Sequence, residues 1–152
     1  MTGASGSAAG CIFCEAAVPS AESDRDRLVL IRGRLSYVVL NRYPYNNGHL
    51  LVAPRRHAAQ LVDLTADEHL ACMTWLARLT EVFSARIHPD GFNIGLNLGR
   101  AAGAGLPGHL HWHLVPRWAG DTNFMSALAG TRVIPQSLEA MWELLTEALR
   151  QS

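Results

Sequence analysis

The sequence has no apolar run long enough to cross a membrane and no excess of charge of either sign. Its 152 residues carry 13 Lys and Arg against 13 Asp and Glu, so no overall attraction to nucleic acid or acidic membranes is implied. A membrane helix needs about 20 consecutive apolar residues. Apolar residues still make up 49% of the chain, enough for one sizeable core. We therefore expect a single domain over 11–152 that binds neither nucleic acid nor membrane.

Cysteine is scarce, and two of the three cysteines stand close together near the N-terminus. Residues 1–10 lack the basic and apolar stretches of a secretory signal, and their Gly, Ser and Ala content is typical of a disordered tail. Cys11 and Cys14 therefore favour reduced thiols or a metal site over a disulfide. These features predict a cytoplasmic protein. Cys72 is interpreted as a small buried hydrophobe inside a helix.

Short apolar runs alternate with two longer segments of helical period. Thr65-Ala66-Asp67-Glu68 has the pattern of a capping box, which predicts a helix from there to about 86, with Leu70, Met73 and Ala77 on one stripe. A last helix is predicted from Pro135 to about Arg150. Strands are predicted at 28–31, 35–40, 49–53, 92–98 and 109–115. This order predicts an α+β fold with antiparallel hairpins.

Three histidines alternate with apolar residues late in the chain, at His109, His111 and His113. Successive side chains of a strand point to opposite faces, so the three imidazoles would share one face. The apolar residues between and after them would face the core. The alternation therefore predicts a strand with a functional histidine face.

Three interpretations of this face remain open. The first is a polar strand face without chemistry, and the second is a three-histidine metal site. The third is nucleophilic catalysis by one neutral imidazole, with a cationic neighbour as acid. A loop of small residues, 97–105, precedes the strand. Its N–H groups could approach an anion closely, which favours a phosphate ligand over a bare metal centre, although the loop also suits a plain hairpin connection.

The run from His109 to Val115, HLHWHLV, resembles the histidine triad motif, and the chain is similar to the HIT superfamily of nucleotide hydrolases and transferases. The resemblance covers nearly everything after Gly10 and includes Asn41 in an N-R-x-P loop. Segments 40–46, 116–124 and 133–136 look like the bacterial diadenosine tetraphosphate phosphorylase branch. The resemblance implies a HIT-like fold, an antiparallel sheet with two main helices, whose sheet extends across a homodimer.

The resemblance also implies roles for individual residues. His111 would attack the α-phosphorus of a nucleotide to form a nucleotidyl-histidine, with its other ring nitrogen fixed by a backbone carbonyl near His109. His113 would bond the phosphate and help the leaving group depart, and His49 matches a fourth active-site histidine. This chemistry needs no metal and no organic cofactor. The implied binding residues are Asn41 at the ribose, and Asn97, Gly103, Ala104, Gly105 and His113 at the phosphates.

The implied substrate is a dinucleoside polyphosphate such as diadenosine tetraphosphate, with inorganic phosphate as the acceptor that yields ADP and ATP. Many hydrolases and phosphoramidases of the family have Gln where this chain has Gly105. Loss of that side chain leaves room for phosphate and favours phosphorolysis, although Gly105 also suits a turn. The alternative is hydrolysis of dinucleoside polyphosphates or nucleoside phosphoramidates, with release of AMP.

Cys11 and Cys14 need two further ligands for a closed tetrahedral zinc site. In some HIT members the histidine of a P-x-x-H element and the first triad histidine complete such a pair. His57 and His109 match those positions, so the resemblance implies a structural zinc. A redox pair and two incidental cysteines are the alternatives. If zinc binds His109, that residue is not free for proton transfer.

Overall fold

The computed structural model describes residues 8–106, 108–121 and 137–152. Residues 1–7 of the predicted tail (1–10) and the predicted helix start at Pro135 lie outside these ranges. No helix among the described residues is long and apolar enough to span a membrane. The elements are α1 (Ile12–Ala16), β1 (Val29–Arg32), β2 (Ser36–Leu40), β3 (Leu50–Pro54), the 3-10 turn η1 (Leu61–Asp63), α2 (Ala66–Arg86), β4 (Gly91–Leu96), the 3-10 turn η2 (Arg100–Ala102), β5 (Trp112–Arg117) and α4 (Leu138–Gln151).

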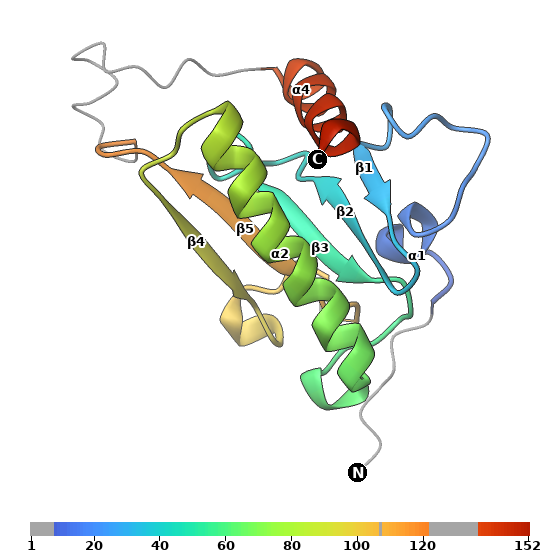
Figure 1. The fold of residues 1–152 in the computed structure, drawn as a ribbon. Coiled ribbons are helices and arrows are strands. Elements are labelled where there is room, and N and C mark those ends of the chain that lie inside the picture. The colour runs from blue at the N-terminus through green and yellow to red at the C-terminus, as the bar shows by residue number, and fades with distance from the viewer. Residues whose placement is uncertain (1–7, 107, 122–136) are drawn as a thin grey trace.

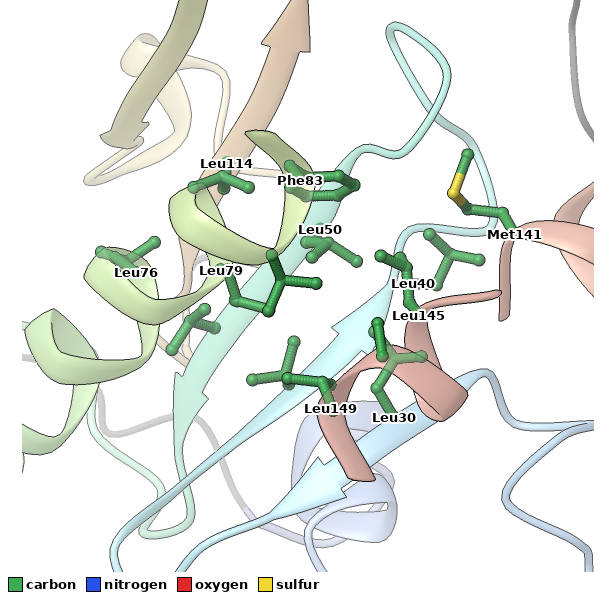
Figure 2. Close-up of a cluster of buried hydrophobic side chains, with 14 of the residues drawn as sticks. Leu30, Leu40, Leu50, Leu76, Leu79, Phe83, Leu114, Met141, Leu145 and Leu149 are labelled. Carbon is green, nitrogen blue, oxygen red and sulfur yellow. The ribbon is translucent and has the colours of Figure 1, made fainter. Parts of the chain in front are cut away.

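One antiparallel sheet, in the order β1-β2-β3-β5-β4, organises the chain, and α2 and α4 lie across one of its faces (Figure 1). This confirms the predicted α+β fold. The core between the sheet and the two helices consists mainly of leucines, with Phe83 and Met141 among them (Figure 2). Burying one such side chain contributes roughly 1.5–3 kcal/mol. The fully buried members include Leu50, Leu79, Leu114 and Leu145.

The short helix α1 packs on the opposite face of the sheet. Five residues cannot form a stable helix alone, so tertiary contacts hold it. Phe13 and Ala17 are buried against Tyr37 and Ala53, and the Tyr37 hydroxyl donates to the Phe13 carbonyl at 2.7 Å. Arg32 Nε donates to the Ala16 carbonyl at the end of α1, at 2.9 Å. These contacts fix Phe13 above the sheet, where the site is built.

Helix α2 begins with the predicted capping box. The Thr65 hydroxyl accepts from the Glu68 N–H at 3.2 Å, and the Glu68 carboxylate accepts from the Thr65 N–H at 2.8 Å. Cys72 is fully buried, as predicted. The predicted stripe was wrong, because Leu70 is 65% exposed and Met73 is 42% exposed. The helix instead buries Glu68, Cys72, Leu76, Leu79, Val82 and Phe83.

An ion pair allows Glu68 to lie on the buried face. The Glu68 carboxylate lies 2.7 Å from the Arg56 guanidinium and is almost fully buried. A buried carboxylate needs such a partner, and the hydrogen bond from Arg56 lowers the pKa of Glu68 to about 2. Placing Glu68 inward turns Leu70 outward. The sequence pattern alone contains no sign of this pairing across 12 residues.

The histidine strand starts later than predicted, at Trp112 rather than His109. The segment before it lies beside the chain that follows β3. Leu110 N–H donates to the Ala58 carbonyl at 2.7 Å, outside the ladder that begins at Trp112. The alternation still holds, because Leu110 and Leu114 are buried. The other strands shift from their predicted bounds by one or two residues at an end, and β5 extends through Pro116 to Arg117.

The corrected face of α2 can be tested with two leucines on the same helix. We expect Leu79→Ala to lower the free energy of unfolding by about 2–5 kcal/mol, because it opens a cavity in the core. Leu70→Ala should change it by no more than about 0.5 kcal/mol, since that side chain is mostly exposed. Urea unfolding followed by circular dichroism measures both. Equal losses would contradict the assignment of the buried face.

Candidate functional site

The site lies on the sheet face that α1 partly covers. Val39, Leu51, His113 and Gly95 are register partners across β2, β3, β5 and β4, so their side-chain positions share this face. The opposite face is filled by the core under α2 and α4. The histidines are therefore carried by the centre of the sheet and face away from the main core.

His111 is oriented by one hydrogen bond and one ring. Its Nδ1 lies 2.9 Å from the His109 carbonyl, which can only accept, so Nδ1 carries the proton and Nε2 carries a lone pair. The Phe13 ring stacks on the imidazole with centroids 4.4 Å apart. Burial lowers the pKa of His111. The result is a neutral imidazole with one nucleophilic nitrogen, held by the carbonyl that the resemblance implied.

His49 and His113 form a pair joined by their ring nitrogens, 2.8 Å apart. Nδ1 of the fully buried His49 receives the Tyr45 backbone N–H at 3.1 Å and lies 3.3 Å from the Asn41 amide nitrogen. A backbone N–H can only donate, so Nδ1 of His49 accepts and its Nε2 carries the proton. The His49 Nε2–H donates to Nδ1 of His113, so the single ring N–H of neutral His113 lies on Nε2.

Both members of this pair are neutral at pH 7. Burial, together with the other histidines, lowers the pKa values of His49 and His113 to about 4. The expected cationic neighbour of His111 is therefore uncharged in the free protein. What His113 offers is a hydrogen-bond donor at Nε2, which does not require a charge.

Gly48 sets the position of His49. Its φ is +80°, and a Cβ there would lie 3.1 Å from the Phe83 ring and 3.2 Å from the Pro116 ring. A side chain at this position would therefore be both strained and crowded. The loop between β2 and β3 can press against the core only because residue 48 has no side chain.

The small-residue loop satisfies part of its own backbone. The N–H groups of Gly103 and Ala104 donate to carbonyls of Arg100 and Gly99, at 3.0 and 3.2 Å. These two donors are engaged in the loop, so the expected phosphate contacts would have to replace those bonds. At Gly105 an added Cβ would meet nothing within 4 Å. This position is open, as the absence of the Gln side chain predicts.

Two hollows adjoin the histidines on this face. The α1 hollow, about 320 Å³, is lined by Phe13, Asn41 and Leu51 among others. The β4 hollow, about 330 Å³, adjoins His113. Because Leu51 on β3 and His113 on β5 are register partners, the hollows lie on the two sides of the histidine pair. The polar lining of the β4 hollow comes from Tyr45, Asn46, Asn93, Asn97, His113 and Arg117.

Sequence reasoning missed several of these contributors. Phe13 sits between the two cysteines, where its ring gave no separate signal. Tyr45 and Asn46 belong to the segment 40–46, which was noted for its resemblance, but neither residue was given a role. Asp121 follows the histidine strand, and its carboxylate binds Arg117 with two hydrogen bonds of 2.8 Å. Only the segment 116–124, noted for its resemblance, pointed to this last residue.

Cys11, Cys14, His57 and His109 come together, as the resemblance implied. Their ligand atoms lie within 4.8 Å of one another, with sulfur–Nδ1 distances of 3.2–3.4 Å. A tetrahedral ion bound at usual zinc distances separates sulfur and nitrogen by about 3.5 Å. The His109 Nε2–H donates to the Pro54 carbonyl at 2.9 Å, which directs Nδ1 toward the sulfurs. The group can therefore hold a metal ion.

The three triad histidines do not form such a site. His109 turns Nδ1 to the cysteines, His111 turns Nδ1 to a carbonyl, and His113 turns Nδ1 to His49. Among the described residues, the cluster of metal-binding side chains contains His109 but neither of the other two. The geometry therefore does not support the interpretation in which all three triad histidines bind one metal ion.

Comparison with known proteins identifies the family of this chain. The HIT domain family model matches residues 22–120. The chain is 49% identical over 130 residues to the AP-4-A phosphorylase of Mycobacterium tuberculosis, covering 85% of this chain and 67% of that protein. It is 34% identical over 93 residues to the bis(5'-nucleosyl)-tetraphosphatase (asymmetrical) of Schizosaccharomyces pombe, covering 61% and 50%. Both relatives have the names of enzymes, which agrees with the prediction of an enzyme.

A solved structure gives the same answer for the fold. The crystal structure of a zinc-bound histidine triad family protein from Mycobacterium smegmatis superposes with a TM-score of 0.72 at 27% identity, covering 95% of this chain and 96% of that one. The family model alone spans more than half of the sequence and includes the whole histidine strand. The chain therefore belongs to the HIT domain family.

Proposed function

We propose that this protein transfers a nucleotidyl group through His111, and that its reaction is phosphorolysis of diadenosine tetraphosphate. The observation that carries the proposal is the fixed tautomer of His111, whose Nδ1 is bound to the His109 carbonyl. Its Nε2 lone pair would attack the α-phosphorus, and ATP would leave. Phosphate would then attack the adenylyl-histidine and release ADP. Atoms balance without a metal or an organic cofactor.

The surroundings of His111 support a dinucleotide as substrate. The α1 hollow is lined by Asn41 and by apolar side chains such as Phe13 and Leu51. Apolar side chains suit a nucleotide base, and an amide suits a ribose hydroxyl. The β4 hollow begins at His113 and is rich in amide side chains, including Asn93 and Asn97. A nucleotide in the first hollow would direct the rest of the polyphosphate toward the second. His113 would then bond the phosphate and the leaving oxygen between them.

Two observations support phosphate as the acceptor. The Mycobacterium tuberculosis relative is an AP-4-A phosphorylase, and it shares 49% of residues over most of this chain. The open space at Gly105 provides the room that a Gln side chain would fill. Hydrolysis is the second candidate, because the Schizosaccharomyces pombe relative is a tetraphosphatase.

We also propose that the metal at Cys11, Cys14, His57 and His109 is a structural zinc. Two sulfurs and two imidazoles form a ligand set that zinc favours. Burial and the neighbouring Cys11 raise the pKa of Cys14 to about 11, so a bound cation is needed for this thiol to lose its proton at neutral pH. The ion would tie α1 to the histidine segment and thereby fix Phe13 beside His111. It would take no part in the reaction itself.

A homodimer is the corresponding proposal for the assembly. In the described part of the chain, β4 is an outer strand of the sheet and pairs only with β5. Its Ile94 side chain is 47% exposed, and an open strand edge of this kind suits pairing with a second copy. A joined sheet would place the β4 hollows of two protomers near the shared edge.

The reaction can be settled by product analysis. With diadenosine tetraphosphate and inorganic phosphate we expect ADP and ATP in equal amounts, because phosphate is consumed as the nucleotidyl acceptor. Without phosphate we expect no net turnover. Chromatography of the products measures both conditions. Release of AMP that does not depend on phosphate would contradict phosphorolysis and favour the hydrolase.

The nucleophile can be tested with His111→Asn. The Asn amide can still donate to the His109 carbonyl, so the fold and nucleotide binding should remain, whereas turnover should fall by at least about 1,000-fold for want of a nucleophile. Turnover and AMP affinity measure the two effects. His88→Asn is the matched control. His88 is exposed and has a φ of +50°, a backbone conformation that Asn tolerates. Activity retained in His111→Asn would refute the mechanism.

The metal assignment predicts one zinc per chain by elemental analysis. Cys14→Ser should lose the ion and lower the unfolding temperature, because α1 is then held by fewer contacts. His111→Ala should keep it, since His111 contributes no ligand. Loss of metal in His111→Ala together with retention in Cys14→Ser would instead favour metal binding by the triad.

A further inference from the structure

Asp121 is a buried carboxylate just beyond the histidine strand. Its side chain is 2% exposed, yet it accepts hydrogen bonds from three residues in two parts of the chain. Arg117 donates from Nε and Nη2 at 2.8 Å, and the Trp118 backbone N–H donates at 3.0 Å. Asn46 donates from Nδ2 at 2.5 Å. The last contact joins the end of β5 to the loop between β2 and β3, 75 residues away.

Asn46 is the residue through which Asp121 holds that loop. Its amide nitrogen donates to the Asp121 carboxylate and also to the Pro116 carbonyl, at 3.1 Å. Its backbone carbonyl accepts the His49 N–H at 3.2 Å. Both amide hydrogens are thus anchored to the β5 side, and the main chain is anchored to His49. These contacts fix the residue that follows Tyr45 in the chain.

Two donors face Nδ1 of His49 and decide which of its nitrogens carries the proton. The Tyr45 N–H lies 3.1 Å from Nδ1, and the Tyr45 ring packs 4.5 Å from the same imidazole. The Asn41 amide nitrogen lies 3.3 Å from Nδ1. If the Tyr45 donor moved away, only the longer contact with Asn41 would remain, and His49 could carry its proton on Nδ1 in part of the molecules. The bond to His113 would then reverse, with His113 Nδ1 as donor. Nε2 of His113 would present a lone pair instead of a proton.

We infer that Asp121 is a positioning residue for departure of the leaving group: through Asn46 and Tyr45 it keeps His49 in the tautomer that leaves a proton on Nε2 of His113. The inference rests on the proposed function for its chemical step. There the His111–phosphorus bond forms, and the bond from phosphorus to the leaving oxygen breaks with its electron pair on that oxygen. The His113 Nε2–H donates to it. A lone pair at that nitrogen would repel the same charge.

A leaving oxygen of a polyphosphate needs this donor rather than a full proton. The second ionisation of a phosphate group has a pKa of about 6, so ATP departs as an anion at neutral pH. A more basic leaving oxygen depends more strongly on the hydrogen bond. Loss of the correct tautomer should therefore lower the turnover rate, and the loss should be larger for substrates with a more basic leaving group. A general loss of stability would lower turnover of all substrates alike.

Two variants test the inference. Asp121→Asn keeps the shape of the side chain but removes the charge that attracts Arg117 and Asn46. Asn46→Ala removes the link to the loop and leaves the pair of Arg117 and Asp121 intact, so it covers the case in which Asp121→Asn does not fold. Asp90→Ala is the matched control, because Asp90 accepts the Ala119 N–H of the same turn at 2.8 Å and belongs to neither hollow.

The direct measurement is the nitrogen-15 spectrum of histidine-labelled protein at neutral pH, which distinguishes a protonated Nε2 from a protonated Nδ1. We expect His113 to carry its proton on Nε2 in the unmodified protein and in Asp90→Ala. Either test variant should show a second population with the proton on Nδ1. An unchanged His113 tautomer in a folded Asp121→Asn or Asn46→Ala protein would overturn the inference.

The kinetic measurement uses the phenyl and 4-nitrophenyl esters of AMP. Phenol, with a pKa near 10 as in tyrosine, is the more basic leaving group. We expect Asp121→Asn to lower kcat/KM about 10–100-fold for the phenyl ester and clearly less for the nitrophenyl ester. Equal losses would overturn the inference. If the unmodified protein cleaves neither ester nor diadenosine tetraphosphate, the proposed function fails, and the tautomer spectrum still decides the role of Asp121.

Discussion

His109 is held at both ring nitrogens, by the Pro54 carbonyl at Nε2 and by the two cysteine sulfurs at Nδ1. Its own carbonyl holds His111. One buried residue thus joins the end of β3, the N-terminal helix and the proposed nucleophile. Both of its ring nitrogens and its carbonyl are engaged with other groups, which fits the structural role that we propose for it. The orientation of the remaining histidines presupposes that this residue stays in place.

The site consists of neutral imidazoles, and the Phe13 ring packs on one of them. Burial favours the uncharged forms of His49 and His113, so the protein avoids the free-energy cost of a buried charge. The polarity of the site therefore comes from the direction of each N–H, and the scaffold has to determine every tautomer. A backbone carbonyl determines that of His111, and a backbone N–H determines that of His49.

The sequence predicted those features that are local. The alternation of His109, His111 and His113, and the capping box at Thr65, follow from spacing along a few residues, and both appear in the structure. Features that depend on distant partners were missed. The inward turn of Glu68 needs Arg56, and the late start of β5 needs the chain after β3 as an alternative partner. The same holds for Asp121, whose contact with Asn46 spans 75 residues.

Gly48 connects the hydrophobic core to the chemistry on the opposite face. A Cβ at this position would meet both the Phe83 ring of α2 and the Pro116 ring of β5, and His49 is the next residue. Packing on one side of the sheet is therefore transmitted to the histidine pair on the other without any polar contact. A substitution that places a larger side chain in the core near Phe83 would therefore displace His49. Such a core substitution would have the effect of an active-site mutation, although none of the histidines had been changed.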